Sequence, residues 1–389
     1  GSSASLAGTT EAPGVVVFSA YYDSMSVVPA LSPGAEQAAS VAALLELART
    51  LKRYPLQRKV VFLATAGHCE AMAGARDFIA RHIVARGSGQ DEKLDVAAFV
   101  ALDISSRSRR LGLFYKAHYI DQGGRIQPWF SHLGKAWSRW AGEVCEALGW
   151  DPESAFADCI NSQRGMNWAT HLPGRFAFEG ELATLAGRVG LTFATTDDAR
   201  FAVDTPLDTP ERVDFENLAA QVRLLCCAVP NFFNTAGAFI RKSPNDYWTR
   251  LEARVVEFNF REDYLPNEPV PRALVVVREP VPKKSLCGVR GEPIVLTGQD
   301  GRARLEGLPE RRAVGWWRAT LDLAAFGLER DSGAVAYAPD LGPEGAANYP
   351  LEVQMNAAVR EATIVVFPCR ALTIYDLADQ RYYIPFDTI

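Results

Sequence analysis

The stretch RKVVFLATAGHCEAMAGARDFI, residues 58–79, decides the fold of this chain. Its part KVVFLA, at 59–64, is a short apolar run with β-branched residues, which predicts a buried strand. From Cys69 to Ala85 the sequence predicts a helix. A buried strand followed by a helix is typical of a domain that alternates the two elements.

The same alternation continues on both sides of this stretch. Val15–Ser19 predicts a buried strand, and Ala35–Leu51 predicts a helix after the break at Pro33-Gly34. Val96–Leu102 predicts a third strand. Strand, helix, strand, helix, strand indicates an α/β domain with a mostly parallel central sheet and flanking helices.

The carboxyl ends of parallel strands meet at one edge of their sheet, and ligands of such domains bind beyond that edge. In this chain the ends are Ala20–Asp23, Thr65–Cys69 and Asp103–Ser105. Any site of this domain is therefore expected to be built from these three segments.

Residues 105–178 have mixed polarity, with helical character at 127–149, and we interpret them as a lid or an insertion. Leu191–Thr195 predicts a further strand, and Asp214–Val229 predicts a helix with Thr209 as its N-cap.

From Trp248 onward, short β-rich runs are separated by Gly, Pro and Asp, which is typical of a β-sandwich. The stretch GEPIVLTGQDGRARLEGLP, 291–309, resembles the repeat unit of carboxypeptidase regulatory-like, transthyretin-type sandwich domains. We expect a flexible leader at 1–12, an α/β domain at 13–240 and a β-sandwich at 245–389.

Composition is that of an ordinary globular protein of two domains, with 48% hydrophobic and 22% charged residues and a net charge of −5. No apolar run is long enough to span a membrane. The basic stretch Arg107–Arg110 is short, so we expect a solvated turn there and no nucleic-acid partner.

Four segments together carry a resemblance to the zinc-dependent aminopeptidases of peptidase family M28, which include glutamate carboxypeptidases and the non-peptidase transferrin receptors. The segments are VVVFSAYYDS (15–24), SPGAEQAASVAALLELARTL (32–51), RKVVFLATAGHCEAMAGARDFI (58–79) and VDTPLDTPERVD (203–214). Their order and spacing match the family, and VALDIS (100–105) fits between the last two. The resemblance covers roughly half the chain.

The resemblance implies two zinc ions, about 3.5–4 Å apart, that share a bridging carboxylate and activate a water. Imidazole and carboxylate groups hold the ions, and a separate glutamate acts as general base. Each role can be compared with the residue at the matching position of this sequence.

The first strand of the family ends in His-x-Asp, where the His binds metal. The triplet here is Tyr21-Tyr22-Asp23, so the supporting Asp23 is kept while Tyr21 replaces the ligand. A phenol, with a pKa near 10, is a poor zinc ligand at neutral pH. Glu36 replaces the bridging Asp, and its extra methylene displaces the carboxylate.

The second strand of the family leads into Glu-Glu, the base followed by a ligand. His68 and Cys69 stand at these positions. Asp103 matches the Asp after the third strand, and Asp204 replaces the final His ligand before Thr-Pro. We therefore expect the zinc mechanism to be lost, with no catalytic residue and no bound metal.

The degenerate pocket allows three interpretations. In the first, the chain is a pseudopeptidase whose pocket is filled by tyrosines and hydrogen-bonded polar groups. In the second, Glu36, Cys69, Asp103 and Asp204 form a rebuilt pocket for one cation, such as Ca²⁺, Mg²⁺ or a single Zn²⁺, in a metal-dependent hydrolase. In the third, His68 and Cys69 form a thiol catalyst, although adjacent residues at a strand end usually point apart.

The first interpretation leads to a binding, structural or assembly protein, with a protein partner or self-assembly into a homo-oligomer. Because such relatives and transthyretin-type domains are often exported, the resemblance favours an exported or extracellular location. Family members normally have further elements before the first strand, which is compatible with a processed fragment.

Overall fold

The computed structural model describes most of the chain. The described residues are 2–9, 13–24, 29–84, 93–120, 128–161, 168–174, 176–235, 247–258, 265–278, 293–309, 320–328, 335–338, 351–354, 359–368, 371–377 and 380–385. They fall into two compact units, one ending at Tyr247 and the other beginning at Trp248. Residues 241–244, between the two expected domains, lie outside the described residues.

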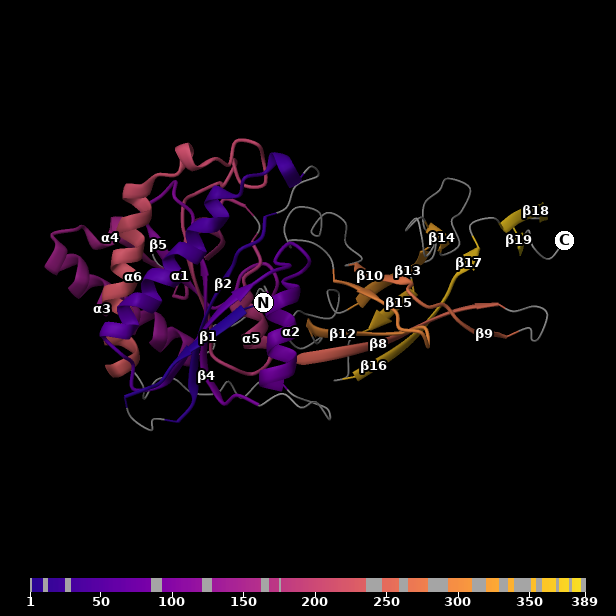
Figure 1. The fold of residues 1–389 in the computed structure, drawn as a ribbon, viewed down its shortest axis with the longest axis horizontal. Helices are drawn as coiled ribbons and strands as arrows, with labels where there is room; N and C mark the ends of the chain where they lie inside the picture. The colour runs from indigo at the N-terminus through magenta and orange to yellow at the C-terminus, as the bar shows by residue number, and fades with distance from the viewer. Residues whose placement is uncertain are drawn as a thin grey trace. The chain divides into compact units, whose positions relative to one another are not determined.

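The first unit is an α/β domain with a mostly parallel sheet (Figure 1). The strand order is β1-β3-β2-β4-β7-β5-β6, in which β3, β2, β4 and β7 are parallel. β1 and β5 each pair with their neighbour in the antiparallel sense. The strands are β1 (Ser2–Leu6), β2 (Val15–Tyr21), β3 (Lys59–Thr65), β4 (Val96–Asp103), β5 (Leu111–Phe114), β6 (Phe156–Asp158) and β7 (Gly190–Thr195).

Helices cover both faces of this sheet, with α1, α3 and α6 on one side and α2 and α5 on the other (Figure 1). The helices are α1 (Ala35–Arg53), α2 (Ala73–Ile79), α3 (Pro128–Leu148), α4 (Pro152–Ala155), α5 (Glu179–Leu185) and α6 (Phe215–Thr235). Shorter helical turns are η1 (Pro29–Leu31), η2 (Ala80–Val84), η3 (Trp168–His171) and η4 (Pro210–Arg212). None of the described helices is long and apolar enough to cross a membrane.

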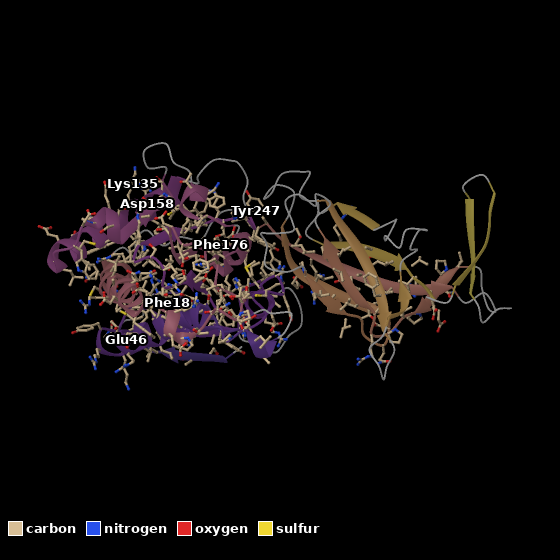
Figure 2. The ribbon with its side chains drawn as sticks, turned by 90° about the horizontal axis from the view of Figure 1, so that it is seen from above. Phe18, Glu46, Lys135, Asp158, Phe176 and Tyr247 are labelled. Carbon is tan, nitrogen blue, oxygen red and sulfur yellow. The ribbon has the colours of Figure 1, made fainter. Side chains whose placement is uncertain are left out.

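Aliphatic side chains and several large aromatic ones form the core between the sheet and α1, α3 and α6. Phe18 of β2 lies deep among the packed side chains, whereas Glu46 lies on the outer side of α1 (Figure 2). The ring of Trp137 in α3 packs 4.6 Å from Phe193 of β7 and 4.6 Å from Phe232 of α6. Burial of such large apolar groups is the main driving force for folding.

The N-terminal residues differ from the expected flexible leader. Ser2–Leu6 forms β1, which pairs with β3 from Leu6 opposite Val60 to Ser2 opposite Ala64. The small polar sequence has little β-propensity of its own, but it covers an edge of β3 that would otherwise be unpaired. Residues 10–12 of the expected leader lie outside the described part.

Residues 105–178 are also more than a lid or an insertion. They supply β5 and β6 to the central sheet and α3 to its cover. The short strands carry four and three residues, which is too few for a periodic signal in the sequence.

Two expected helix boundaries shift as well. α2 begins at Ala73 rather than at Cys69, because Ala71 and Met72 have φ values of 53° and 60° that a right-handed helix cannot include. Thr209 precedes η4 and makes no side-chain cap there. Asp214 caps α6 instead, because its Oδ1 accepts a hydrogen bond from the Asn217 N–H at 3.0 Å.

The second unit is a sandwich-like set of sheets, as the β-rich sequence predicts. Within the described ranges, one sheet has the order β11-β10-β13-β14-β17 with β15 on β13, and another has the order β12-β8-β16 with β9 on β8. β16 runs parallel to β8, and β18 pairs with β19 in a separate hairpin.

These strands begin and end as follows. They are β8 (Trp248–Phe258), β9 (Pro266–Pro269), β10 (Leu274–Arg278), β11 (Ile294–Leu296), β12 (Arg302–Pro309), β13 (Thr320–Leu328), β14 (Val335–Ala338), β15 (Leu351–Gln354), β16 (Val359–Val365), β17 (Phe367–Pro368), β18 (Ala371–Leu377) and β19 (Gln380–Pro385).

Candidate functional site

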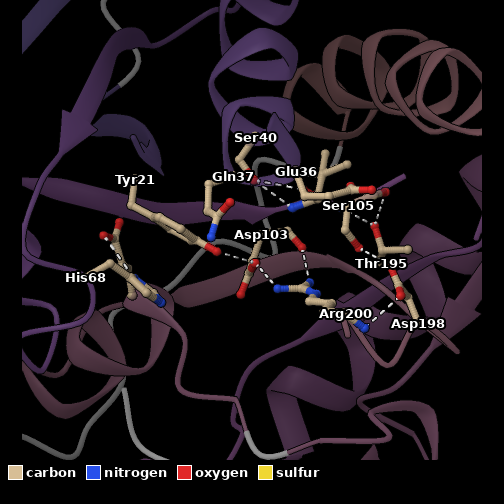
Figure 3. A network of polar contacts seen from close by, with 12 residues as sticks. Tyr21, Glu36, Gln37, Ser40, His68, Asp103, Ser105, Thr195, Asp198 and Arg200 are labelled. Atoms are coloured by element: carbon tan, nitrogen blue, oxygen red, sulfur yellow. Dashed lines mark hydrogen bonds and ion pairs between the residues drawn. The ribbon is translucent and has the colours of Figure 1, made fainter. Parts of the chain in front are cut away.

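The expected pocket residues lie at the carboxyl edge of the central sheet. Because β2, β3 and β4 are parallel and neighbouring, Tyr21, Thr65 and Asp103 end their strands at the same edge. Figure 3 shows Tyr21, Glu36, His68 and Asp103 around one network of polar contacts. These four residues were assigned to one pocket from the sequence.

Tyr21 connects two of these residues and is itself buried. Its hydroxyl donates a hydrogen bond to Asp103 Oδ1 at 3.1 Å. Its ring stacks on the imidazole of His68, with ring centroids 3.8 Å apart and planes inclined by 15°. The phenol thus fills the space between strand ends with an aromatic stack and a hydrogen bond.

Arg200 is the cation of the site. Its guanidinium forms an ion pair with the Asp103 carboxylate through Nη1, and Nη2 donates to the main-chain oxygen of Asp103 at 2.7 Å (Figure 3). Both side chains are buried, with 4% of each exposed. A paired, hydrogen-bonded guanidinium compensates a buried carboxylate that would otherwise be strongly unfavourable.

The backbone conformation and the neighbours of Arg200 hold its guanidinium beside Asp103. The residue has φ of 49°, in the left-handed region, and its N–H donates to Asp198 Oδ1 at 2.8 Å. The guanidinium carbon lies 4.6 Å from the ring centre of Phe176. A non-glycine residue at positive φ is unfavourable by itself, so these contacts hold it in place.

Glu36 lies in the first turn of α1 and has both carboxylate oxygens bound. Ser106 donates its N–H to Oε2 at 2.7 Å and its hydroxyl to Oε1 at 2.6 Å. Arg107 lies 3.7 Å from the same carboxylate. The longer side chain of Glu, compared with Asp, thus reaches the loop that follows β4.

The 204–208 loop is tied to the start of α1. Asp208 Oδ1 accepts a hydrogen bond from the Glu36 N–H at 2.7 Å, and Asp204 Oδ1 accepts one from Gln37 Nε2 at 2.8 Å. Burial raises the pKa of Asp208, and the nearby charge of Asp204 adds to this. The backbone N–H groups of Ala35 and Glu36 act in the opposite direction.

His68 follows β3 and is buried against a second carboxylate. Its Nδ1 lies 3.7 Å from Oε1 of Glu179. The Glu179 carboxylate also accepts two hydrogen bonds, from the Thr65 hydroxyl to Oε1 at 2.5 Å and from the Ser19 hydroxyl to Oε2 at 2.8 Å. The His68 N–H donates to Asp23 Oδ2 at 3.0 Å. Asp23 therefore supports the backbone of the segment that follows β3.

Comparison with known families decides the ancestry of this unit. Residues 3–147 match the sequence model described as peptidase family M28. Residues 3–147 belong to peptidase family M28. The first of the similar solved structures are described as zinc aminopeptidases.

We call the first unit, Gly1–Tyr247, the M28 unit, after the match at residues 3–147. Three solved structures are similar to part of this chain. BSAP, a zinc aminopeptidase from Bacillus subtilis, is 19% identical over 62% of this chain and 52% of its own, with a TM-score of 0.42. An aminopeptidase from Aneurinibacillus sp. strain AM-1 is 16% identical over 58% and 46%, with a TM-score of 0.39. A glutaminyl cyclase from Macrostomum lignano is 15% identical over 59% and 71%, with a TM-score of 0.41.

The chain spans about half the length of the first two of these structures. Comparison with curated protein sequences gave no match.

The contacts join four of the seven residues that the sequence analysis assigned to the former metal and base pocket: Tyr21, Asp23, His68 and Asp103. Glu36 and Asp204 have their described contacts with other residues, and Cys69 is the buried chain neighbour of His68. Within the described ranges, no three His, Cys, Asp or Glu side chains are grouped so that they could hold a metal ion.

Three further residues of the M28 unit take part in the network without having been predicted: Arg200, Glu179 and Ser106. Arg200 follows β7, the neighbour of β4 in the sheet, so its position just after a strand end was a usable signal. Asp198, which lies shortly after β7, accepts a hydrogen bond from the Ser105 hydroxyl at 2.6 Å. Glu179 begins α5 and reaches the site from the other face of the sheet, for which the sequence offers no signal.

Proposed function

We propose that the M28 unit is a pseudopeptidase and that the protein acts as a binding, structural or assembly protein. The observation that carries the proposal is the ion pair between Arg200 and Asp103. Among the ligand positions of the family resemblance, Asp103 is the one at which this sequence keeps the family's residue. An internal guanidinium neutralises its charge, as a metal ion does in active relatives.

The donor set also fits two zinc ions poorly. The Tyr21 hydroxyl donates a hydrogen bond to Asp103, and both carboxylate oxygens of Glu36 accept hydrogen bonds from Ser106. Asp204 accepts a hydrogen bond from Gln37. The Tyr21 hydroxyl would have to lose its proton, and with it its hydrogen bond to Asp103, before it could ligate a metal as a phenolate. The carboxylates would share their lone pairs with the donors that already bind them.

The first experiment measures zinc content and hydrolysis of aminoacyl-arylamides by the wild-type protein. We expect less than stoichiometric zinc after dialysis against micromolar zinc, and no turnover above a heat-denatured control. Stoichiometric metal with chelator-sensitive turnover would contradict the proposal and favour a metal-dependent hydrolase instead.

A second experiment separates the ligand substitutions from Arg200. One variant carries Tyr21→His, Glu36→Asp, His68→Glu, Cys69→Glu and Asp204→His, and a second adds Arg200→Ala. Because the Arg200 guanidinium pairs with the Asp103 carboxylate, we expect the variant with all six substitutions to bind zinc more tightly than the variant with five. Circular dichroism establishes that both fold, and equal zinc binding by the two folded variants would show that Arg200 does not oppose the metal.

Exposed apolar side chains beside the pocket support a role in association. Tyr22, Phe201 and Leu207 are 53%, 63% and 46% exposed and lie in the segments that carry the pocket residues. Exposed apolar groups that gather at one site often mark protein contacts.

We expect concentration-dependent self-association, or capture of a protein partner, that Phe201→Ser with Leu207→Ser weakens. Sedimentation equilibrium measures it, with Leu45→Ser, on an exposed position of α1, as the matched control.

A further inference from the structure

The second unit contains a charged groove on the outward face of β12, β8 and β16. Its volume is about 480 Å³. The charged and hydroxyl side chains that line it are Glu252, Arg254, Asp300, Arg302, Arg304, Glu361 and Thr363. These positions alternate along each strand with buried residues such as Ala253, Ala303 and Ala362, so the charged side chains share the outward face.

The strand register arranges these charges in two rows. In the first row, Arg254 stands opposite Arg302 on one side and Thr363 on the other. In the second row, Glu252 stands opposite Arg304 and Glu361. Each row thus places two like charges directly opposite each other, Arg254 with Arg302 and Glu252 with Glu361, which is unfavourable in a sheet without a compensating partner.

Some of these charges are compensated within the unit. Arg304 pairs with Glu306 at 2.8 Å, and Arg250 pairs with Glu252 at 3.0 Å. Each of these ion pairs joins alternate residues of one strand. These two ion pairs compensate the charges of Arg304 and Glu252.

Three other charges of the groove are available to a ligand: Arg254, Arg302 and Glu361. Within the described ranges, Arg254 donates to the main-chain oxygen of Asn267 at 3.2 Å and forms no ion pair. Arg302 lies 3.9 Å from Asp300, at the limit of an ion pair, with its side chain 65% exposed. Glu361 is exposed and, in the same part of the chain, forms no ion pair.

We propose that this groove binds an extended peptide segment that carries an acidic and a basic side chain two positions apart. The carboxylate of the peptide lies between Arg254 and Arg302, where Thr363 adds a hydroxyl, and its cation lies on Glu361, opposite Glu252. The two rows are two residues apart along each strand, which is about 6.6–6.8 Å. Side chains at positions i and i+2 of an extended peptide have the same spacing.

The charge pattern also selects against simpler ligands. A free phosphate would meet the Asp300 carboxylate beside Arg302 and the glutamates of the second row, whereas a peptide presents a cation to those glutamates. The proposal rests on the second unit alone and is independent of whether the M28 unit has activity.

The test titrates the full chain with fluorescein-labelled, C-terminally amidated Glu-Ala-Lys and follows anisotropy at low salt. We expect weak, saturable binding, and weaker binding of Glu-Ala-Glu and Lys-Ala-Lys. Arg254→Glu with Arg302→Glu should weaken Glu-Ala-Lys binding about tenfold, because attractive contacts become repulsive. Arg223→Glu on α6, an exposed arginine of the M28 unit, is the control and should leave it unchanged.

Three results would overturn the proposal: no binding by the wild-type protein, equal binding of all three peptides, or an unchanged affinity in the double variant. Competition by inorganic phosphate at equal concentration would show a simple anion site instead and would also overturn it. If the double variant fails to fold, Arg254→Lys and Glu361→Gln serve in its place. Each should weaken binding about two- to fivefold, since an exposed ion pair contributes little.

Discussion

The guanidinium of Arg200 holds both the side chain and the main chain of Asp103. Nη1 pairs with the carboxylate, and Nη2 donates to the main-chain oxygen at 2.7 Å. This relationship links the end of β4 to the loop after β7 by one buried cation. It makes Asp103, which stands at a ligand position of the family resemblance, part of an internal ion pair.

Removal of this cation should be costly. We expect Arg200→Met to lower the free energy of unfolding by about 3–5 kcal/mol, because it leaves the Asp103 carboxylate buried without its counter-charge. Urea denaturation measures the loss. Adding Asp103→Asn should recover part of it, since the unpaired charge is then gone.

The control is Arg81→Gln, which breaks the exposed ion pair between Arg81 of η2 and Asp77 of α2. That change should stay within about 0.5 kcal/mol. Equal effects of Arg200→Met and Arg81→Gln would contradict a stabilising role for the buried pair.

The hydrogen bonds of Glu36 lead to a second prediction. Glu36→Gln replaces one carboxylate oxygen by an NH2 group, which cannot accept, opposite one of the two Ser106 donors. A buried donor without an acceptor costs about 1–3 kcal/mol, so the free energy of unfolding should fall by that amount. Glu46→Gln, on the exposed side of α1, is the matched variant. An effect no larger than that of Glu46→Gln would mean that Ser106 finds another acceptor.

Glu181 should give the protein a distinct pH dependence. Its carboxylate accepts backbone N–H groups of Ala117 at 2.6 Å, Ile120 at 2.9 Å and Phe178 at 2.9 Å. Complete burial outweighs these bonds and raises the pKa of Glu181 from 4.5 to about 7. The folded protein therefore binds this proton more tightly than the unfolded chain does.

The sign follows from that difference. The contribution of Glu181 is fully present below pH 4.5 and is lost as the pH rises through about 7. Its size is about 3 kcal/mol over this window. Glu181→Gln should flatten the pH profile of unfolding between these values, whereas exposed Glu146→Gln should not. A profile with the same slope in both variants would exclude Glu181 as its source.

A glycine contact between α5 and β7 provides a stability test away from the polar network. A Cβ at Gly190 would overlap the main-chain oxygen of Gly180, which cannot move unless α5 moves off the sheet. Gly190→Ala should therefore cost about 3 kcal/mol or more, as measured by thermal unfolding. Gly142→Ala in α3 meets no atom within 4 Å and should instead stabilise the protein by about 0.5–1 kcal/mol. Similar melting temperatures for the two variants would contradict the close contact.

Much of the M28 unit could be predicted from local sequence. Val15–Ser19 and Lys59–Ala64 predict β2 and β3 because continuous apolar runs mark strands that are buried on both faces. Tyr21 and Asp103 could be assigned to one site because parallel neighbouring strands end at a common edge. The helix at Ala35–Leu51 was likewise predicted, and it extends to Arg53.

Other parts could not be predicted because their cause is not local. Ser2–Leu6 is a strand only because β3 offers it an edge. Glu179 meets His68 only because α5 packs against β7 and β4, on the face of the sheet opposite α1.

The sequence by itself predicted the α/β alternation, the edge of the sheet at which Tyr21 and Asp103 end their strands, and, through the family resemblance, which side chains stand at the family's ligand positions. Those properties depend on hydrophobic pattern and on position in a matched motif. Tertiary structure alone decided what those side chains bind. The partners Arg200 and Ser106 are 97 and 70 residues away from Asp103 and Glu36 along the chain, and only the folded sheet brings their charges and donors into contact.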